Sequence, residues 1–306
     1  MLYSRDFFKL TSGNFLFLAL ALALCSFFRP VLAQTRLPTL AVLDFGNGPF
    51  GRIAANGLVT RLKSVPDINI LDRDVIRIAV RGTGYSGSLN LALRQARDLG
   101  DAIGCDFYLL GDAQSLRRST SDKPVYYEAY GSIFLVSSRT GKLVWWQRPS
   151  FEAAEAGVAE QKLLDRLSAD VFYRQIVDAI QAAQKQEKLQ RDSFSAAALP
   201  VIEEAPEDEK AADASGLRLP KPYRRLRPPY PDTAARADAE AVVDVVVDLD
   251  AAGEVTRADI TRWAGFGLDE ATIDTVRRLH FFPAMRDGTA IPIRVLLRYN
   301  FHKPAR

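Results

Sequence analysis

Apolar and polar residues alternate with a period of two near the C-terminal end of the chain. In residues 241–249, valine and leucine occupy every second position from Val243 onward, and Asp244 and Asp248 fall between them. Such alternation places the apolar side chains on one face of a β-strand and the aspartates on the other. Residues 255–263 predict a second strand, which returns antiparallel after a turn that contains glycine. Residues 291–301 alternate in the same way and predict a last, half-buried strand.

Between the second and the last of these strands, the apolar spacing changes to that of a helix. Leu268, Thr272, Val276 and Leu279 share one stripe at helical spacing. Acidic residues fall in the first turn of this helix and arginines near its end, as the helix dipole favours. One aromatic ring of the pair at 281–282 is expected to fill the core between helix and sheet. The predicted order is therefore ββαβ, a small α+β domain with one helix across a three-stranded sheet.

Short motifs flank these elements in a fixed order. Tyr230-Pro231-x-x-Ala234-x-Arg236 opens the stretch, and Phe281-Phe282-Pro283-Ala284, Gly288 and Ile291-Pro292-Ile293 follow the helix. With this order, Tyr230–Phe301 resembles the C-terminal domain of the TonB family, periplasmic adaptors that contact outer-membrane transporters. The stretch departs from the family pattern in two places. Trp263-Ala264 stands where Ser-Ser is common, and Leu279-His280 stands where Trp and a basic residue are common.

The resemblance implies a docking edge. In the family, the partner is a short N-terminal segment of a transporter, and an extended peptide can add to a sheet edge as a further strand. The last strand, about Ile293–Tyr299, is then the expected edge. The expected partner-binding residues are Ile293, Arg294, Val295, Leu296, Leu297, Arg298 and Tyr299, with Tyr230 and Pro231. Arg294 and Arg298 would select acidic or polar partners; the alternative is that both are merely solvated.

The earlier part of the chain, residues 35–190, alternates between strand and helix signals. Apolar runs predict strands at 39–45, 68–71, 105–111, 126–136 and 142–147. Helical spacing lies at 51–63, after Asp72, at 89–99 with Gly100 as its end, and across 163–180 as one long closing helix. This alternation predicts a mixed α/β sandwich. The pattern in Ala41–Phe45, Leu71–Arg73, Gly104–Gly111 and Thr140–Val144 looks like the N-terminal domain of TolB and the related curli-secretion CsgG domain. That resemblance implies a cell-envelope assembly or interaction module.

Residues 191–227 are expected to form a disordered, charged linker that contains prolines and precedes the C-terminal domain at 228–306. Its first part is rich in Ala, Glu and Pro, with an acidic block at 203–209, and has too few apolar groups to form a core. A basic block with prolines follows at 218–229 and predicts a semi-extended spacer. A solvated linker is the simpler interpretation of the basic block, and contact with anionic lipid is the alternative.

The first 33 residues predict export. Arg5 and Lys9 precede an apolar run, Phe15–Phe28, whose length is typical of a signal peptide and short for a membrane span. We expect cleavage after Ala33 and a periplasmic mature chain; the alternative is an uncleaved inner-membrane anchor that faces the periplasm. Cys105 would then be the remaining cysteine, and its apolar surroundings predict a buried structural thiol.

Two features invite a catalytic interpretation, and neither has a suitable context. Gly82-x-Gly84-x-x-Gly87 spells a dinucleotide fingerprint, but it follows a helix where the fingerprint requires a strand. Asp44, Asp72 and Asp106 lie at strand ends without metal-spaced histidines, so capping and turn roles are expected. The net charge of +3 is too small to argue for nucleic acid. The sequence therefore predicts no enzyme, no cofactor, no metal site and no nucleic-acid partner.

These observations predict a periplasmic adaptor of the TonB type that binds outer-membrane transporter peptides by strand addition, with energy-coupled transmembrane transport as the finer hypothesis. Other envelope proteins are alternative partners, an anchored form would add inner-membrane motor proteins, and a homodimer is left open. The run Phe15–Phe28 lacks the histidine of the family's anchor helix, which weighs against direct coupling to a motor. The alternative function is a cell-envelope assembly or structural interaction protein without energy coupling.

Overall fold

The computed structural model describes residues 36–120, 123–194, 202–206 and 209–303. Helix and strand occur in similar shares, about 36% and 35%, which confirms the mixed α and β class. The predicted signal segment lies outside the described residues. Across those residues, no helix combines the length and the apolar character that a membrane crossing requires. The chain from Pro38 onward forms one compact unit, which contains two main sheets.

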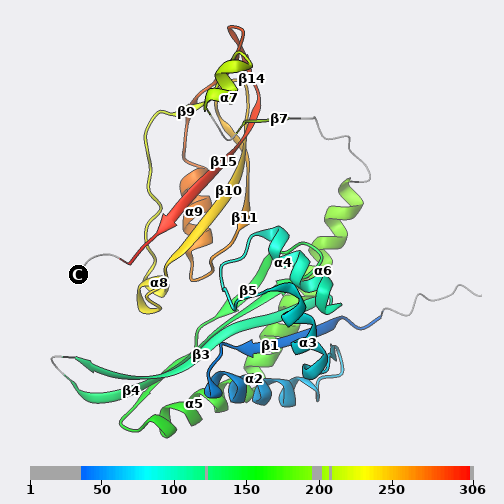
Figure 1. Cartoon of the computed structure of the whole chain (residues 1–306), viewed down its shortest axis with the longest axis vertical. Coiled ribbons are helices and arrows are strands. Elements are labelled where there is room, and N and C mark those ends of the chain that lie inside the picture. Colours follow the sequence, from blue (N-terminus) through cyan, green and yellow to red (C-terminus); the bar gives the residue numbers. More distant parts are fainter. Residues whose placement is uncertain (1–35, 121–122, 195–201, 207–208, 304–306) are drawn as a thin grey trace, which may run out of the picture. The chain divides into compact units, whose positions relative to one another are not determined.

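The first sheet has the strand order β2-β1-β3-β4-β5, and β6 also pairs with β4. Its strands are β1 (Thr39–Phe45), β2 (Asn69–Ile70), β3 (Phe107–Thr120), β4 (Lys123–Ser137), β5 (Leu143–Gln147) and β6 (Ser150–Ala153). β1 pairs parallel with β2 and β3, whereas β4 pairs antiparallel with β3, β5 and β6. The long β3–β4 hairpin extends past the ends of the other strands (Figure 1). The sequence predicted β4 and β5 but missed β6 and the full length of β3.

Helices cover both faces of this sheet. They are α2 (Pro49–Leu62), α5 (Ala156–Ser168) and α6 (Asp170–Phe194) on one face, and α3 (Arg73–Thr83) and α4 (Leu93–Ile103) on the other. The predicted single closing helix is wrong, because extended backbone at Ala169 divides it into α5 and α6. The predicted end of α4 at Gly100 is also wrong. Gly100 is a close-approach residue, since a Cβ there would lie 2.4 Å from that of Ser138, and Gly104 ends the helix instead.

The second sheet has the order β11-β10-β15-β7. Its elements are β7 (Glu203–Glu204), α8 (Asp232–Arg236), β10 (Ala241–Leu249), β11 (Val255–Arg262), α9 (Leu268–Val276) and β15 (Ile293–Phe301). β10 pairs antiparallel with β11 and β15, and α9 follows β11, so the predicted ββαβ order is confirmed (Figure 1). Phe281 is the core aromatic residue, with 2% of its surface exposed, whereas Phe282 is 58% exposed.

The predicted linker is ordered in part. Its described residues form β7, α7 (Glu209–Ala214), β8 (Leu217–Arg218) and β9 (Lys221–Pro222). β8 pairs with β13 (Ala284–Arg286), which also pairs with β14 (Thr289–Ile291), and β9 pairs with β12 (Phe281–Phe282). Ala212 and Leu217 are buried. Few apolar residues are enough here, because the segment docks on the core of the second sheet and needs no core of its own.

The two sheets share one hydrophobic core through Trp263, the residue after β11. Its ring stacks on Phe134 of β4 with the ring centroids 6.0 Å apart, and its Nε1–H donates to the carbonyl oxygen of Gly141 at 2.9 Å. Gly265 completes the contact, because a Cβ there would lie 2.4 Å from the Phe134 ring. Trp263 departs from the TonB pattern, and its position gives a physical reason: it fills the contact between the two sheets.

Asn90 fixes the same contact with backbone hydrogen bonds. Its Nδ2 donates to the carbonyl oxygens of Val242 at 2.8 Å and Trp263 at 2.6 Å, and its Oδ1 accepts from the N–H of Val242 at 3.1 Å. Buried polar groups need partners of this kind, since an unpaired one destabilises the fold. The N-terminal part and the C-terminal part of the compact unit are therefore joined by packing and by specific hydrogen bonds.

Candidate functional site

The candidate site is the outer edge of β15. The carbonyl oxygen of Arg294 accepts from the N–H of Ala205 at 2.8 Å, so this carbonyl points away from β10. Alternate residues of a strand direct their backbone groups to the same side. The N–H and C=O groups of Leu296, Arg298 and Asn300 therefore point to this edge as well. Past Arg294, the part of the chain that the structure describes places no strand against it. Such a row of groups is an acceptor for an added strand.

The opposite edge of the sheet, on β11, is covered at one end. The end of β11 forms a bridge between Arg262 and Ala92, and the N–H of Trp263 donates to the carbonyl oxygen of Leu91 at 3.3 Å. Arg262 also donates to the carbonyl oxygen of Asn90 at 3.2 Å. Residues 90–92 thus cover one end of that edge. β7 covers one end of the β15 edge in the same way, so the resemblance described above, and not the length of the edge, favours β15.

Two arginines on β15 form ion pairs across the sheet. Arg294 makes a bidentate pair with Asp248 at 2.6 and 2.9 Å, and Arg298 makes one with Asp244 at 2.7 and 2.9 Å. The residues Asp244 and Asp248 are 5% and 4% exposed. The two arginines are therefore not merely solvated, because each neutralises a buried carboxylate. Whether they also select a partner stays a prediction.

The charge network holds Asp244 in its ionised form. Burial acts to raise the pKa of Asp244, but hydrogen bonds and charge from Arg298 and Arg262 outweigh it and leave the pKa below its ordinary value. Leu296 lies between Arg294 and Arg298 in the sequence and is 49% exposed. The edge thus presents an apolar side chain between two polar ones.

The opening motif of the domain has a structural role. The hydroxyl of Tyr230 donates to the carbonyl oxygen of Ala239 at 2.6 Å, and its ring centroid lies 6.5 Å from that of Phe301 at the end of β15. Pro231 is the N-cap residue of α8. The predicted site residues Tyr230 and Pro231 therefore stabilise the start of the domain. Of the two, Tyr230 contacts β15, through its ring pair with Phe301.

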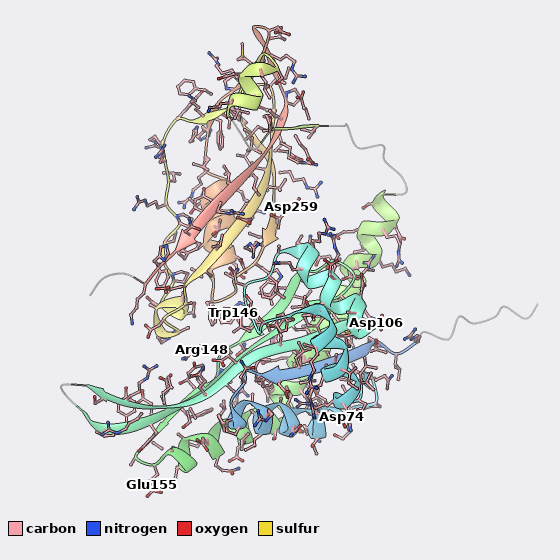
Figure 2. All side chains as sticks on the ribbon, viewed as in Figure 1. Asp74, Asp106, Trp146, Arg148, Glu155 and Asp259 are labelled. Atoms are coloured by element: carbon pink, nitrogen blue, oxygen red, sulfur yellow. The ribbon has the colours of Figure 1, made fainter. Side chains whose placement is uncertain are left out.

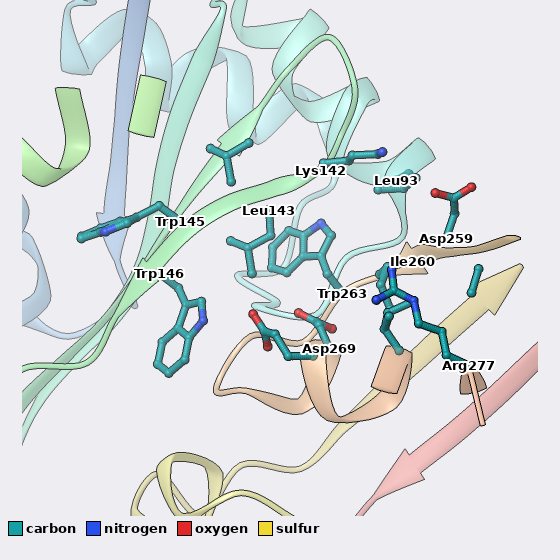
Figure 3. Close-up of a pocket in the computed structure, with 14 residues that line it drawn as sticks. Leu93, Lys142, Leu143, Trp145, Trp146, Asp259, Ile260, Trp263, Asp269 and Arg277 are labelled. Atoms are coloured by element: carbon teal, nitrogen blue, oxygen red, sulfur yellow. The ribbon is translucent and has the colours of Figure 1, made fainter. Parts of the chain in front are cut away.

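A second candidate is a pocket of about 490 Å³ lined by residues of β5, β11 and α9 (Figure 3). Trp146, Trp263, Asp269 and Arg277 are among its lining residues. The two carboxylate oxygens of Asp269 accept from the N–H groups of Ala264 and Gly265 at 2.9 and 2.8 Å. Burial raises the pKa of Asp269, and these hydrogen bonds act in the opposite direction. Burial is the larger effect, so the pKa is raised to about 7. The carboxyl group of Asp269 therefore stabilises the loop before α9 through these hydrogen bonds. We assign the pocket no ligand.

Of the three aspartates near the first sheet, Asp72 has the predicted capping role, whereas Asp44 and Asp106 bind side chains and backbone of neighbouring elements. Asp72 caps α3 by accepting from the N–H of Asp74 at 2.8 Å. Asp106 accepts from the N–H and the hydroxyl of Thr39 at 2.7 and 2.8 Å (Figure 2). Asp44 forms an ion pair with Arg73. All three carboxylates thus bind groups of the fold.

Cys105 is the buried thiol that the sequence predicts. Its Sγ lies 3.4 Å from the hydroxyl oxygen of Ser138. Burial raises its pKa to about 11, so the thiol is protonated at neutral pH.

A match to a protein-family model agrees with the geometry of the second sheet. Residues 227–302 match the family model described as Gram-negative bacterial TonB protein C-terminal. A search of curated proteins finds no match. Among solved structures, the TonB CTD of Pseudomonas aeruginosa is 19% identical, with a TM-score of 0.25, over 28% of this chain and 89% of that chain.

Two other solved structures are similar to this chain at low sequence identity. LpoB of E. coli is 14% identical, with a TM-score of 0.29, over 39% of this chain and 57% of that chain. The hypothetical protein CT253 of Chlamydia trachomatis is 12% identical, with a TM-score of 0.31, over 47% of this chain and 99% of that chain. The resemblance of residues 35–190 to TolB and CsgG domains stays a prediction. The family match and the ββαβ geometry together identify residues 227–302 of this chain as a TonB C-terminal domain.

Proposed function

We propose that this protein is an envelope adaptor that binds an extended peptide along the outer edge of β15. The observation that carries the proposal is the outer edge of β15 in a domain that matches the TonB C-terminal model: beyond Arg294, the described residues place no further strand against it. Strand addition suits this edge because main-chain hydrogen bonds give affinity and alternate side chains give selectivity. The partner class is an outer-membrane transporter segment exposed to the periplasm.

The free energies expected for strand addition favour a weak and reversible contact between the peptide and β15. An intramolecular or interfacial hydrogen bond contributes about 0.5–1.5 kcal/mol net. A few such bonds barely offset the cost of ordering the peptide, which is about 0.5–1.5 kcal/mol for each immobilised side chain. Side-chain contacts with Leu296, the exposed apolar residue on β15, would then decide whether a peptide binds.

The direct test uses a photoreactive amino acid at the edge. We expect benzoylphenylalanine in place of Leu296 to cross-link the protein to an outer-membrane transporter in cells. The same group in place of Arg257, an exposed residue of β11, serves as the control and should give no transporter adduct. Equal adducts at both positions, or none at Leu296, would refute the proposal.

The second candidate function is an envelope assembly protein without energy coupling. Its support is the shared core, through which Trp263 and Asn90 join the TonB domain to the first sheet. A force-transmitting adaptor needs a link to an energised membrane, so transport should stop in cells treated with a protonophore. Transporter adducts at Leu296 that persist unchanged after such treatment, together with normal uptake in a deletion strain, would favour the assembly function.

A further inference from the structure

The edge of β15 already holds a short strand of the same chain. β7, residues Glu203–Glu204, pairs parallel with Ile293–Arg294. The N–H of Ala205 donates to the carbonyl oxygen of Arg294 at 2.8 Å, which adds a hydrogen bond beyond the paired residues. The segment comes from the acidic block that precedes the domain, so a part of the chain more than 80 residues away in sequence occupies this edge. Nothing in the apolar pattern of the sequence indicates a strand there.

Two ion pairs hold the segment Glu203–Ala205 in its position on the sheet. Glu203 accepts from Nη2 of Arg286 at 2.5 Å, and Glu204 lies 3.9 Å from Nη1 of Arg294. The Nε and Nη2 atoms of Arg294 are engaged with Asp248, so Nη1 is the atom left for the edge. Two adjacent glutamates thus face one cation each, on two different strands. Exposed ion pairs add little stability, but they select the register and exclude like-charged alternatives.

We infer that residues Glu203–Ala205 act as an internal competitor for the docking edge, and that the partner peptide is acidic where it meets Arg286 and Arg294. This inference rests on the proposed function of the β15 edge. The internal strand covers the edge only as far as Arg294. A partner that pairs along the rest of the edge makes additional main-chain bonds, and it displaces β7 only if it replaces the two carboxylates. The acidic segment therefore acts as a filter against neutral or basic extended peptides.

The first test measures release of the segment without any partner. In the full mature chain, Glu203→Gln with Glu204→Gln removes both charges but keeps the N–H of Ala205. We expect amide hydrogen exchange at Ala205 to become at least tenfold faster, a change of about 1.4 kcal/mol in opening free energy. The matched control is Asp213→Asn, which removes an exposed acid from the same stretch. An unchanged exchange rate at Ala205 would overturn the inference.

The second test measures competition with a defined probe. A fluorescent peptide with the chain's own sequence, Val-Ile-Glu-Glu-Ala-Pro, should bind the double glutamine variant at least tenfold more tightly than it binds the wild type. A peptide with glutamine at both glutamate positions should bind the variant at least tenfold more weakly than the glutamate peptide. Equal affinities in either comparison, or no binding of the glutamate peptide to the variant, would overturn the inference.

The two proposals fail in different ways. Transporter adducts at Leu296 with equal peptide affinities would leave the docking function standing and refute the internal competitor. Faster exchange at Ala205 and selective binding of the glutamate peptide, without any transporter adduct, would refute the transporter as partner and leave the acidic competitor in place.

Discussion

Replacement of Trp263 tests whether the two sheets are one cooperative structure. The side chain is 2% exposed, stacks on Phe134 and donates a hydrogen bond to Gly141. Truncation of a buried tryptophan to alanine destabilises a protein by about 3–5 kcal/mol, because apolar burial is lost and a cavity remains. We expect Trp263→Ala to lower the free energy of unfolding of the protein by that amount. Equilibrium urea denaturation followed by far-UV circular dichroism measures it.

Further variants separate the contributions of this residue. Trp263→Phe keeps a ring but leaves the carbonyl oxygen of Gly141 without its donor, which should destabilise by about 1–3 kcal/mol. A double-mutant cycle with Phe134→Leu should give a coupling of about 0.5–1.5 kcal/mol, since aromatic pairs contribute this much beyond area burial. Ile78→Ala, at a 71% exposed position, is the control and should change stability by no more than about 0.5 kcal/mol. A loss below about 1 kcal/mol for Trp263→Ala, or no coupling, would refute the shared core.

Three other predictions follow from buried groups. Cys105 should react with a thiol reagent at pH 8 at least a hundredfold more slowly in the native chain than in urea, since burial raises its pKa to about 11; comparable rates would contradict a buried thiol. The pKa of Asp269 is raised above its unfolded value to about 7, so the stability it contributes is full below about pH 4 and is lost as the pH rises through 7. Asp269→Asn should therefore flatten the decline in unfolding free energy from pH 4.5 to 7.5, and an unchanged slope would show that other groups cause it. Leu217→Ala, at a position 1% exposed, should destabilise by about 2–5 kcal/mol in urea denaturation, whereas a change near zero would mean that the segment around β8 does not dock.

The sequence predicted the elements whose signals are local. The valines of β10 and the alternation in β15 show a period of two, and the apolar stripe of α9 and the acids of its first turn indicate a helix. The buried position of Cys105 follows from its apolar neighbours in the same way. These features need no knowledge of the rest of the chain.

Other features depend on contacts between distant residues, so no local signal marks them. β7 is two glutamates in a stretch that reads as disordered, and it is a strand only because β15 lies beside it. Gly100 resembles a helix end but serves the approach of Ser138. The pairing of Arg294 with Asp248 requires the register of β10 on β15, which alternation alone leaves open. Trp263 departs from the family pattern, and its ring partner Phe134 lies on a strand of the first sheet, which no local signal indicates.

The most direct test of the β15 edge as a docking site is to remove one outward N–H. Leu296→Pro deletes this donor, and proline is tolerated on an edge strand where the N–H faces outward. Leu296→Ala keeps the donor and is the matched control for the lost side chain. Calorimetric titration of each variant protein with peptides from the periplasmic N-terminal segments of outer-membrane transporters gives the affinities. We predict at least tenfold weaker binding for Leu296→Pro than for Leu296→Ala, with both variants folded. Equal binding by the two variants would contradict strand addition at this edge.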